Sequence, residues 1–299
     1  MKQQTATRAA TAPRTRTALQ VLYPRVVDAL AWLVLIGAVA LVLAPVVFMF
    51  VASVMPAREI FRMPFAWWPE TFTLDNFYQG IRGNDGRYLF PRTVLNSVFV
   101  ATTIALSTVL LSAITGYSLA KLPFKGRIVV LFLILASLMI PFEAIMIPLY
   151  IVITGMNLQD TYPGLIVPFL ISPFGVFLMR QSLLSFPDEL LDAARIDGAS
   201  ELGILWRIVL PNSMPAMAVL GVLTFSSQWD NLIWPLLVVQ SDFMKTIPLY
   251  IVNFAEEKHT NEGAMLAVAV MASLPMLAMF VMLANFFLRG ANLFAASKG

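Results

Sequence analysis

The chain has 299 residues, of which 59% are hydrophobic and only 12% are charged, and its mean hydropathy is +0.79. Soluble domains carry about twice that share of charged residues, so the composition excludes a soluble globular protein and predicts lipid as the main solvent. The absence of cysteine excludes a disulfide framework and a thiolate metal site, and the single histidine, His259, excludes a histidine-based metal cluster.

The net charge of +3 is small, and it indicates loop charges that orient a membrane protein rather than a nucleic-acid-binding surface. The sequence contains no phosphate-binding loop of the Walker type, because no glycine is followed at the required spacing by Gly-Lys-Ser or Gly-Lys-Thr. We therefore expect no cofactor and no metal on this chain, and any ATP that drives its activity must bind another subunit.

Residues 1–27 form a polar N-terminal segment with one lysine and four arginines. This composition predicts a disordered cytoplasmic tail, and the Arg-, Thr- and Ala-rich start leaves a transit peptide as the alternative. The apolar run that follows, residues 29–54, is longer than the roughly 7–15 residues of a signal-peptide core. We expect it to be retained as the first membrane span.

Six apolar segments are long enough for the roughly 20 residues with which a helix crosses the hydrocarbon core of a membrane. The sequence therefore predicts an all-α polytopic membrane protein with six transmembrane helices in residues 28–299. Prolines inside these segments predict kinks, which membrane helices tolerate when neighbouring groups satisfy the freed carbonyls. The predicted spans are 29–54, 94–119, 128–153, 163–184, 215–240 and 264–288. The prolines within them are Pro45, Pro141, Pro148, Pro168, Pro173, Pro235 and Pro275.

The distribution of lysine and arginine predicts the orientation of these spans. With the N-terminus inside the cell, the inside segments hold 13 of the 20 basic residues and the outside segments hold 7. This bias favours cytoplasmic N- and C-termini. The first outside loop, residues 56–92, is rich in aromatic residues, which leaves two interpretations: an aromatic belt at the membrane interface, or a docking surface for an external partner.

Residues 187–211, between the fourth and fifth predicted spans, are too polar to cross lipid and are spaced like two short helices. Ser185 is expected to cap a helix that begins near Pro187, with Asp188 in a capping-box-like position. The apolar side of this first helix is predicted to comprise Leu190, Leu191, Ala193 and Ala194.

The second half of this segment follows a predicted chain reversal at Gly198, where a positive φ is required. A second short helix is predicted from the spacing of its apolar residues, and Pro211 is expected to stop it. These apolar residues are Leu202, Leu205, Trp206 and Val209.

Two interpretations of this segment remain open: an amphipathic helix that lies on lipid, and a helix that fits into a groove of a partner protein. The segment is acidic, and anionic inner-leaflet lipid would repel it, which favours the partner. Its acidic residues are Asp188, Glu189, Asp192, Asp197 and Glu201, against the basic residues Arg195 and Arg207.

The residues of this segment resemble the "EAA" signature of ABC importer permeases, in which Glu-Ala-Ala, three residues, Gly and nine residues precede Ile-x-Leu-Pro. The matching positions here are Asp192, Ala193, Ala194, Asp197, Gly198, Ala199, Ile208, Leu210 and Pro211. The departures are Asp192, where Glu is usual, and Leu205, where Phe is common.

Further stretches are similar to the carbohydrate-importer branch of that family, which includes maltose and glycerol-phosphate permeases. These stretches are "NSVFVATTIALSTVLLSAITGYSLAKLPFKGR", "FLMRQSLLSFPDELLDAARIDGA", "WDNLIWPLLVV" and "KTIPLYI". The similarity covers about residues 88–290. The chain has six predicted spans and no large inserted domain on the outside, and in this it resembles the second permease of maltose-type systems.

The resemblance implies a permease subunit of a binding-protein-dependent sugar importer in the bacterial inner membrane. It implies as partners a second permease subunit, two copies of an ATPase subunit that binds ATP and Mg²⁺, an extracytoplasmic sugar-binding protein and membrane lipid, but no nucleic acid. The segment 187–211 would then be a cytoplasmic coupling segment that docks in the ATPase and biases the pore from inward-open to outward-open.

The resemblance also suggests a role for the small and acidic residues of this segment. Ala193, Ala194 and Ala199 would form a close-fitting surface, because bulky side chains hold two surfaces apart. Gly198 would permit the bend. Asp192 and Asp197 would cap helices or accept hydrogen bonds from the ATPase.

Polar residues within or near the predicted spans are candidates for a substrate path, because sugars need hydrogen-bonding groups and an aromatic face. The alternative for each is a contact between helices or a position near the outer surface. The candidates are Glu143, Gln228, Trp229, Asp230 and Asn231.

Two other classes of protein compete with an importer subunit. A self-sufficient secondary transporter calls for inverted repeats with paired broken helices, and no convincing internal repeat is present. A membrane enzyme calls for a nucleophile or metal constellation, and the sequence offers none.

Overall fold

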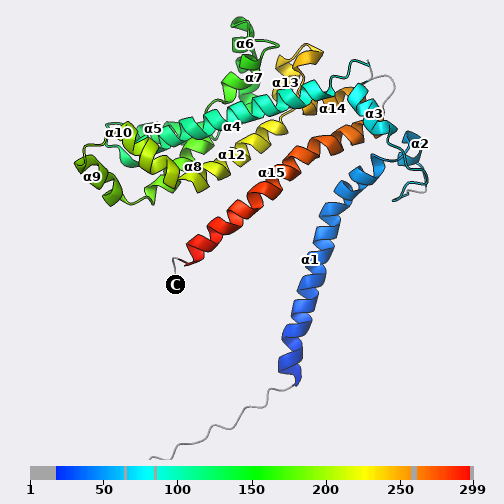
Figure 1. Cartoon of the computed structure of the whole chain (residues 1–299), viewed down its shortest axis with the longest axis horizontal. Helices are drawn as coiled ribbons and strands as arrows, with labels where there is room; N and C mark the ends of the chain where they lie inside the picture. The colour runs from blue at the N-terminus through cyan, green and yellow to red at the C-terminus, as the bar shows by residue number, and fades with distance from the viewer. Residues whose placement is uncertain (1–17, 64–65, 84–85, 257–260, 297–299) are drawn as a thin grey trace, which may run out of the picture. The chain divides into compact units, whose positions relative to one another are not determined.

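A computed structural model describes residues 18–63, 66–83, 86–256 and 261–296, and every regular element in these ranges is a helix (Figure 1). Residues 1–17 of the predicted tail and His259 lie outside the described residues. The chain divides into two compact units, residues 1–50 and 51–299. The all-α prediction is confirmed for the part of the chain that the structure describes.

The described part of the first unit is helix α1 (Ala18–Ala52) without its last two residues; α1 starts within the predicted tail, about ten residues before the predicted span. Its segment Val27–Ala52 is long and apolar enough to cross a membrane.

Three helices that pack side by side form the centre of the second unit: α4 (Phe90–Lys121), α8 (Pro173–Leu184) and α12 (Met214–Trp229) (Figure 1). Gly116 of α4 lies so close to α8 that an added Cβ would be 2.8 Å from the backbone nitrogen of Arg180. Small residues of this kind let helix backbones approach each other in membranes, so the sequence at Gly116 permits the tight α4–α8 contact.

Two predicted spans are broken rather than continuous. Residues 127–155 form α5 (Arg127–Ser137) and α6 (Phe142–Gly155), which meet at 98°. Residues 162–184 form α7 (Tyr162–Ile166), the 3-10 helix η1 (Val167–Phe169) and α8, with a 44° bend. Pro141 precedes α6 in an extended conformation and Pro173 begins α8. These two prolines start helices, because proline lacks the N–H that would continue the preceding helix, and each stands at a bend of the chain.

The predicted span 215–240 is also divided. It consists of α12, which ends at Trp229, and α13 (Ile233–Val238). Asn231 accepts a hydrogen bond from the backbone of Trp234 at 3.3 Å, so a polar side chain starts α13 after the break. The prediction of one continuous helix here is wrong.

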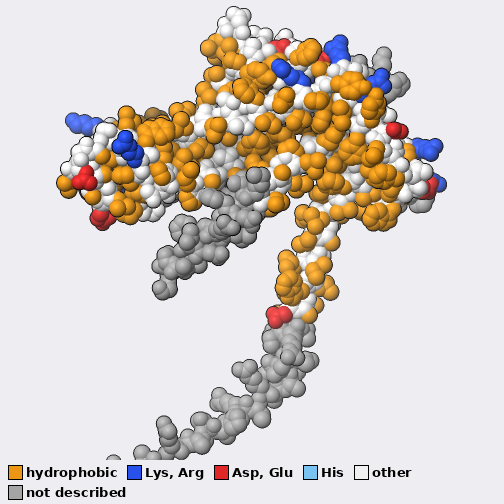
Figure 2. Space-filling view, in the orientation of Figure 1, with side chains coloured by type: hydrophobic (Ala, Val, Ile, Leu, Met, Phe, Trp, Pro, Cys, Tyr) orange, Lys and Arg blue, Asp and Glu red, His pale blue; other side chains and the backbone are white. Residues whose placement is uncertain are grey.

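Three described helices are long and apolar enough to cross a membrane on their own: α1, α4 and α15 (Glu262–Ala296). The number rises to six if each of three bent pairs counts as one span. The third pair joins residues 201–212 to α12 at 77°. On the face of the second unit in Figure 2, the charged side chains gather near its ends and the surface between them is mainly hydrophobic.

The end of the second unit opposite the segment 187–211 contains α2 (Ala57–Ile60), α3 (Asp75–Arg82), the 3-10 helix η3 (Asp242–Met244) and α14 (Ile247–Glu256) (Figure 1). The α3 helix packs on α15, and the carbonyl of Gly80 in α3 accepts a hydrogen bond from the hydroxyl of Tyr250 in α14 at 2.9 Å. Asn76 donates to the carbonyls of Ser53 and Met55 at 2.9 and 2.7 Å. These contacts fix the base of the aromatic loop 56–92.

Glu59 joins the two stretches of chain at the neck of that loop, which is defined here by Glu59 on one side and Glu70 and Thr71 on the other. Its carboxylate accepts hydrogen bonds from the Thr71 hydroxyl at 2.6 Å and from the backbone N–H of Glu70 at 3.0 Å. The Thr71 hydroxyl holds the pKa of Glu59 below its usual range. Beyond this neck Phe61 and Trp68 are exposed at 70% and 73%, so the loop presents an apolar tip.

Candidate coupling segment and substrate path

The segment 187–211 contains a helix, a glycine turn and a second helical stretch. The first helix, α9, covers Asp188–Ile196 and is preceded by Pro187. The predicted cap by Ser185 is wrong, because this hydroxyl donates to the carbonyl of Ser182 at 2.8 Å instead. Proline supplies the fixed φ that starts α9, and Asp188 and Glu189 place negative charge in its first turn.

The turn after α9 has the hydrogen bonds of a Schellman motif. Gly198 has φ +80°. The N–H of Ala199 donates to the carbonyl of Ala194 at 2.9 Å, and the N–H of Gly198 donates to that of Arg195 at 3.0 Å. A left-handed residue at this position satisfies the last carbonyls of a helix, and glycine adopts it without strain. The chain reversal is therefore built by Gly198, in the place that the sequence predicts.

The second helical stretch is made of α10 (Glu201–Ile204), a π-helical turn (Leu205–Val209) and α11 (Leu210–Asn212). Ser200 caps it by accepting a hydrogen bond from the N–H of Gly203 at 3.2 Å, a cap that the Ser-Glu start signals but that we did not predict. The stretch runs one residue past Pro211, which lies in its last turn. Pro211 thus does not stop the helix.

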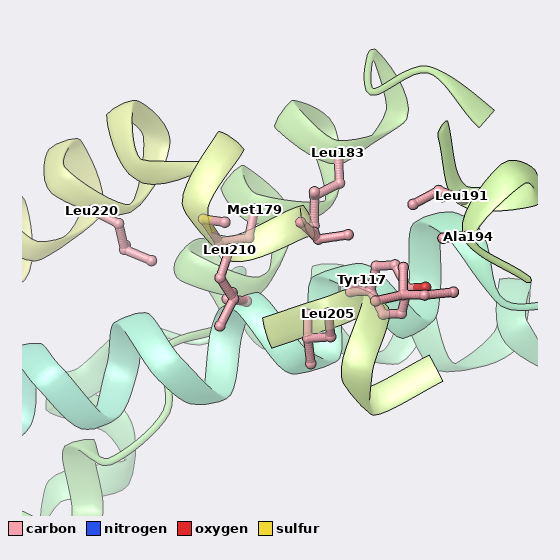
Figure 3. Packing of buried hydrophobic residues seen from close by; sticks show 11 residues of the cluster. Tyr117, Met179, Leu183, Leu191, Ala194, Leu205, Leu210 and Leu220 are labelled. Carbon is pink, nitrogen blue, oxygen red and sulfur yellow. The ribbon is translucent and has the colours of Figure 1, made fainter. Parts of the chain in front are cut away.

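The buried side of this segment packs on α4 and α8. The predicted apolar side of α9 is partly wrong: Leu191 and Ala194 are buried, whereas Leu190 and Ala193 are exposed. Ala194 therefore belongs to the internal core. Figure 3 shows the cluster that results. Its members from α9 and 201–212 are Leu191, Ala194, Ile204, Leu205, Val209 and Leu210, and those from α4, α8 and α12 are Ala113, Tyr117, Met179, Leu183 and Leu220, with Ile208 packed against them.

A buried lysine joins the end of α4 to the start of α9. The ammonium group of Lys121 donates to the carbonyl of Phe186 at 2.7 Å and to the Asp188 carboxylate at 2.6 Å. Its side chain is only 6% exposed. An ammonium group buried to this degree requires partners, because an unpaired buried charge is strongly destabilising.

A second polar connection joins α4 to α10. The Tyr117 hydroxyl donates to one oxygen of Glu201 at 2.6 Å, and Arg195 donates to the other oxygen at 2.8 Å. Arg195 also donates to Asp192 at 2.8 Å. The roles of Lys121 and Tyr117 were not predicted, because no local pattern relates residues so far apart in the chain.

The exposed surface of the segment carries apolar side chains beside the acidic ones. Leu190, Ile196, Leu202 and Trp206 expose more than half of their surfaces, and the exposed fraction of Ile196 reaches 87%. Ala193, Asp197 and Ala199 are exposed on the same segment. Of the four apolar residues at helical spacing in the second helix, only Leu205 and Val209 are buried in the core.

The five predicted path residues do not form one site. Trp229 is buried, stacks on Phe225 and donates to the carbonyl of Ala272 at 3.2 Å, so it connects α12 to α15. Asn231 donates to Gln228 at 3.3 Å beside the break after α12. Asp230 is exposed at that break, and Glu143, in the first turn of α6, is also exposed.

Of these five residues, Gln228 alone lines a cavity of about 310 Å³ between α4, α6, α8 and α12. The wall contains hydroxyl groups that we did not predict, because serine and threonine in apolar segments carry no distinctive spacing. No charged residue lines the cavity in the described structure. Its polar residues are Thr108, Ser172, Thr224, Ser227 and Gln228, and its aromatic residues are Phe142, Phe169 and Phe174.

Comparisons with known proteins agree with the fold. Residues 109–289 match the family described as "Binding-protein-dependent transport system inner membrane component". The arabinooligosaccharides transport system permease protein AraQ of Halalkalibacterium halodurans is 35% identical over 87% of this chain and 94% of the relative. The sn-glycerol-3-phosphate transport system permease protein UgpE of Rhizobium meliloti is 33% identical over 86% and 93%.

A solved structure has the same fold. The crystal structure of a bacterial ABC transporter involved in the import of the acidic polysaccharide alginate contains a chain with a TM-score of 0.77 and 21% sequence identity, over 92% of this chain and 100% of that chain. The resemblance to ABC importer permeases is thereby confirmed, and a self-sufficient secondary transporter is not favoured. The chain belongs to the family of binding-protein-dependent transport system inner membrane components, and it is a membrane permease subunit rather than an enzyme.

Proposed function

We propose that the chain is one of two membrane subunits of an ATP-driven importer of a neutral di- or oligosaccharide or a related polyol. A relative named for arabinooligosaccharides supports the class of substrate. The cavity beside Gln228 supports a neutral substrate, since it offers hydroxyl, amide and aromatic groups but no charge. Such groups bind sugar hydroxyls and sugar faces.

The proposal places six spans in the bacterial inner membrane with both termini in the cytoplasm. The bent pairs 127–155 and 162–184 would then each be one span, and α12 with α13 would form the fifth span. Non-helical backbone is tolerated at membrane depth where protein or a water-filled cavity surrounds it. The break before Pro173 meets this condition, because Ser172 and Phe169 line the cavity of about 310 Å³.

The coupling segment 187–211 is proposed to lie in the cytoplasm and to dock on the ATPase subunit. The observation that carries this role is the set of exposed apolar side chains on the segment, Leu190, Ile196, Leu202 and Trp206, which is backed by a buried core and two polar connections to α4. An apolar surface held this rigidly suits a partner's groove, because little conformational entropy is lost on docking.

The residues of the proposed signature divide into two groups. Ala193, Asp197 and Ala199 are exposed and would contact the ATPase, and Gly198 sets the turn that presents them. The remaining residues, Asp192, Ala194, Ile208, Leu210 and Pro211, would shape the segment from within or at its edges, Asp192 through its ion pair with Arg195.

The partners in this proposal are a second permease subunit, two copies of the ATPase that bind ATP and Mg²⁺, and an extracytoplasmic sugar-binding protein. Closure of the ATPase dimer would move the docked segment and shift the pore from inward-open to outward-open. Asp230, Asn231 and Glu143 would lie beside the path, whereas Trp229 would hold α12 on α15.

Reconstitution in vesicles tests the function. The full complex, supplied with ATP and sugar-loaded binding protein, is expected to take up labelled oligosaccharide, and omission of the ATPase subunit is expected to abolish uptake. Uptake driven by an ion gradient without the ATPase would instead identify a secondary transporter. The variant Gln228→Leu is expected to raise KM with the ATPase still bound, and unchanged uptake kinetics would remove Gln228 from the path.

A further inference from the structure

The helix α4 is bonded to both ends of the second unit. At one end, the Lys121 ammonium and the Tyr117 hydroxyl hold α9 and α10 through hydrogen bonds of 2.6–2.7 Å. At the other end, the buried side chain of Asn96 donates to the carbonyls of Phe243 and Lys245 at 2.8 and 2.9 Å.

The loop 240–247 at that second end is held by α4 through further bonds. Asn96 accepts a hydrogen bond from the Tyr162 hydroxyl at 2.7 Å, and the Ser97 hydroxyl accepts one from the N–H of Ile247 at 2.8 Å. Asp160 accepts the N–H groups of Gln240 and Ser241, both at 3.0 Å. The start of α4 therefore anchors the loop through Asn96 and Ser97, and Asp160, which lies outside α4, adds two contacts with the loop backbone.

The helix between these two ends is continuous. Its 32 residues contain proline only in the first turn, whereas the other helices of the central group follow a break: α8 follows the break at Pro173, and α12 meets residues 201–212 at 77°. Lys121 lies 25 residues after Asn96, so the helix between them spans about 38 Å at 1.5 Å per residue. This exceeds the hydrocarbon core of about 30 Å, so the two sets of bonds would lie on opposite sides of a membrane.

We propose that α4 transmits the movement of the coupling segment across the membrane to the loop 240–247. Tyr117 and Lys121 at one end, and Asn96 at the other, are its positioning residues. The proposal rests on the proposed function, because the movement begins with ATPase closure. It adds the route by which this movement would cross the membrane. The segment is joined covalently to α8 and α12, but a break in the chain precedes each of these helices. The helix α4 has no such break, so it can pass the displacement from one end to the other.

The chemistry of the contacts explains why the two parts would move together. The Lys121 ammonium is buried, so separating it from Asp188 and the Phe186 carbonyl would leave an uncompensated charge. Hydrogen bonds to charged groups, such as that from Tyr117 to Glu201, are stronger than neutral ones. Moving α4 with the segment preserves all of these bonds.

A fluorescent label on the loop tests the route. The exposed Gln240 is replaced by cysteine, the only one in this chain, and labelled in a reconstituted complex with cysteine-free partner subunits. A non-hydrolysable ATP analogue is expected to change the emission of the label in the parent complex. The change is expected to fall about tenfold in Lys121→Met, the factor by which loss of a charged hydrogen bond shifts an equilibrium. The matched control, Lys125→Met, removes an exposed lysine four residues away and should keep the full change.

Two further variants guard against misfolding. Tyr117→Phe removes only a hydroxyl group, and Asn96→Leu acts at the end remote from the ATPase, so both should reduce the change while the ATPase still co-purifies. A full-size change in Lys121→Met and Tyr117→Phe overturns the proposal. The proposal is also overturned if the parent complex binds the ATPase but the ATP analogue does not change the emission of the label. If the ATPase does not co-purify with the parent protein, the proposed function fails and the transmission route fails with it.

Discussion

Replacing Gly198 with valine is the perturbation whose effect the structure defines best. Gly198 has φ +80°, and an added Cβ would meet no atom within 4 Å. Steric conflict with the rest of the protein is therefore absent, and the penalty comes from the left-handed backbone, which costs an L-residue about 1–2 kcal/mol and a β-branched residue at least the upper figure. With a penalty of about 2 kcal/mol, valine should lower the ratio of molecules with the left-handed turn at residue 198 to molecules with another turn there about 30-fold.

Such a shift should uncouple the protein without preventing membrane insertion. The turn orients Ala199 and the start of α10, so a changed turn displaces the exposed surface that we propose docks on the ATPase. We expect Gly198→Val to lose most sugar-stimulated ATP hydrolysis in the reconstituted complex. Gly198→Asn should retain much of it, because asparagine tolerates the left-handed region.

Gly126 supplies a matched control for this experiment. It also has a positive φ, +85°, with open space around its Cβ position, but it lies in the turn before α5. Gly126→Val should impose a similar backbone strain and keep stimulated hydrolysis. Normal hydrolysis in Gly198→Val, or equal damage from the asparagine and valine variants at this position, would refute the reasoning.

Three other predictions concern residues with distinct environments. Leu191→Ala should lower the free energy of unfolding by about 2–5 kcal/mol, because Leu191 is 1% exposed; a thermal melt in detergent measures this. Trp229→Ala should lower both sugar uptake and the melting temperature, whereas Gln228→Leu should lower uptake and leave the melting temperature unchanged. Lost uptake at an unchanged melting temperature in Trp229→Ala would instead place the tryptophan in the path. A fluorophore on Trp68→Cys should be quenched by spin-labelled lipid headgroups more than one on Asp75→Cys, and equal quenching would argue for a protein partner at this loop.

The coupling segment could be predicted in outline because its signals are local. Gly198 marks a left-handed turn and the apolar spacing marks two short helices, and both lie where the sequence places them. The orientation of each helix could not be predicted, because Leu190 and Leu191 are equally apolar. Packing in the same core as Tyr117 of α4, which is distant in the chain, decides that Leu191 is the buried one.

The breaks in the spans could not be predicted for a related physical reason. Hydropathy averaged over about 20 residues reports the preferred solvent of a segment, but not the path of its backbone. Pro148 and Pro275 lie inside helices, whereas Pro141 and Pro173 start them. Trp229 looked like a sugar-stacking residue beside polar neighbours, and only the position of α15 shows that its indole N–H is used by Ala272.

A cysteine cross-link between this chain and its ATPase tests the central claim most directly. The chain has no native cysteine, so Ala199→Cys gives one exposed thiol on the coupling segment, to be paired with single cysteines along the cleft of the ATPase. Ala194→Cys, buried in the core, is the matched control. The account predicts an oxidative cross-link at Ala199 that changes with ATP, and none at Ala194. A folded, inserted complex in which neither position cross-links would contradict the account and return the segment to the lipid surface.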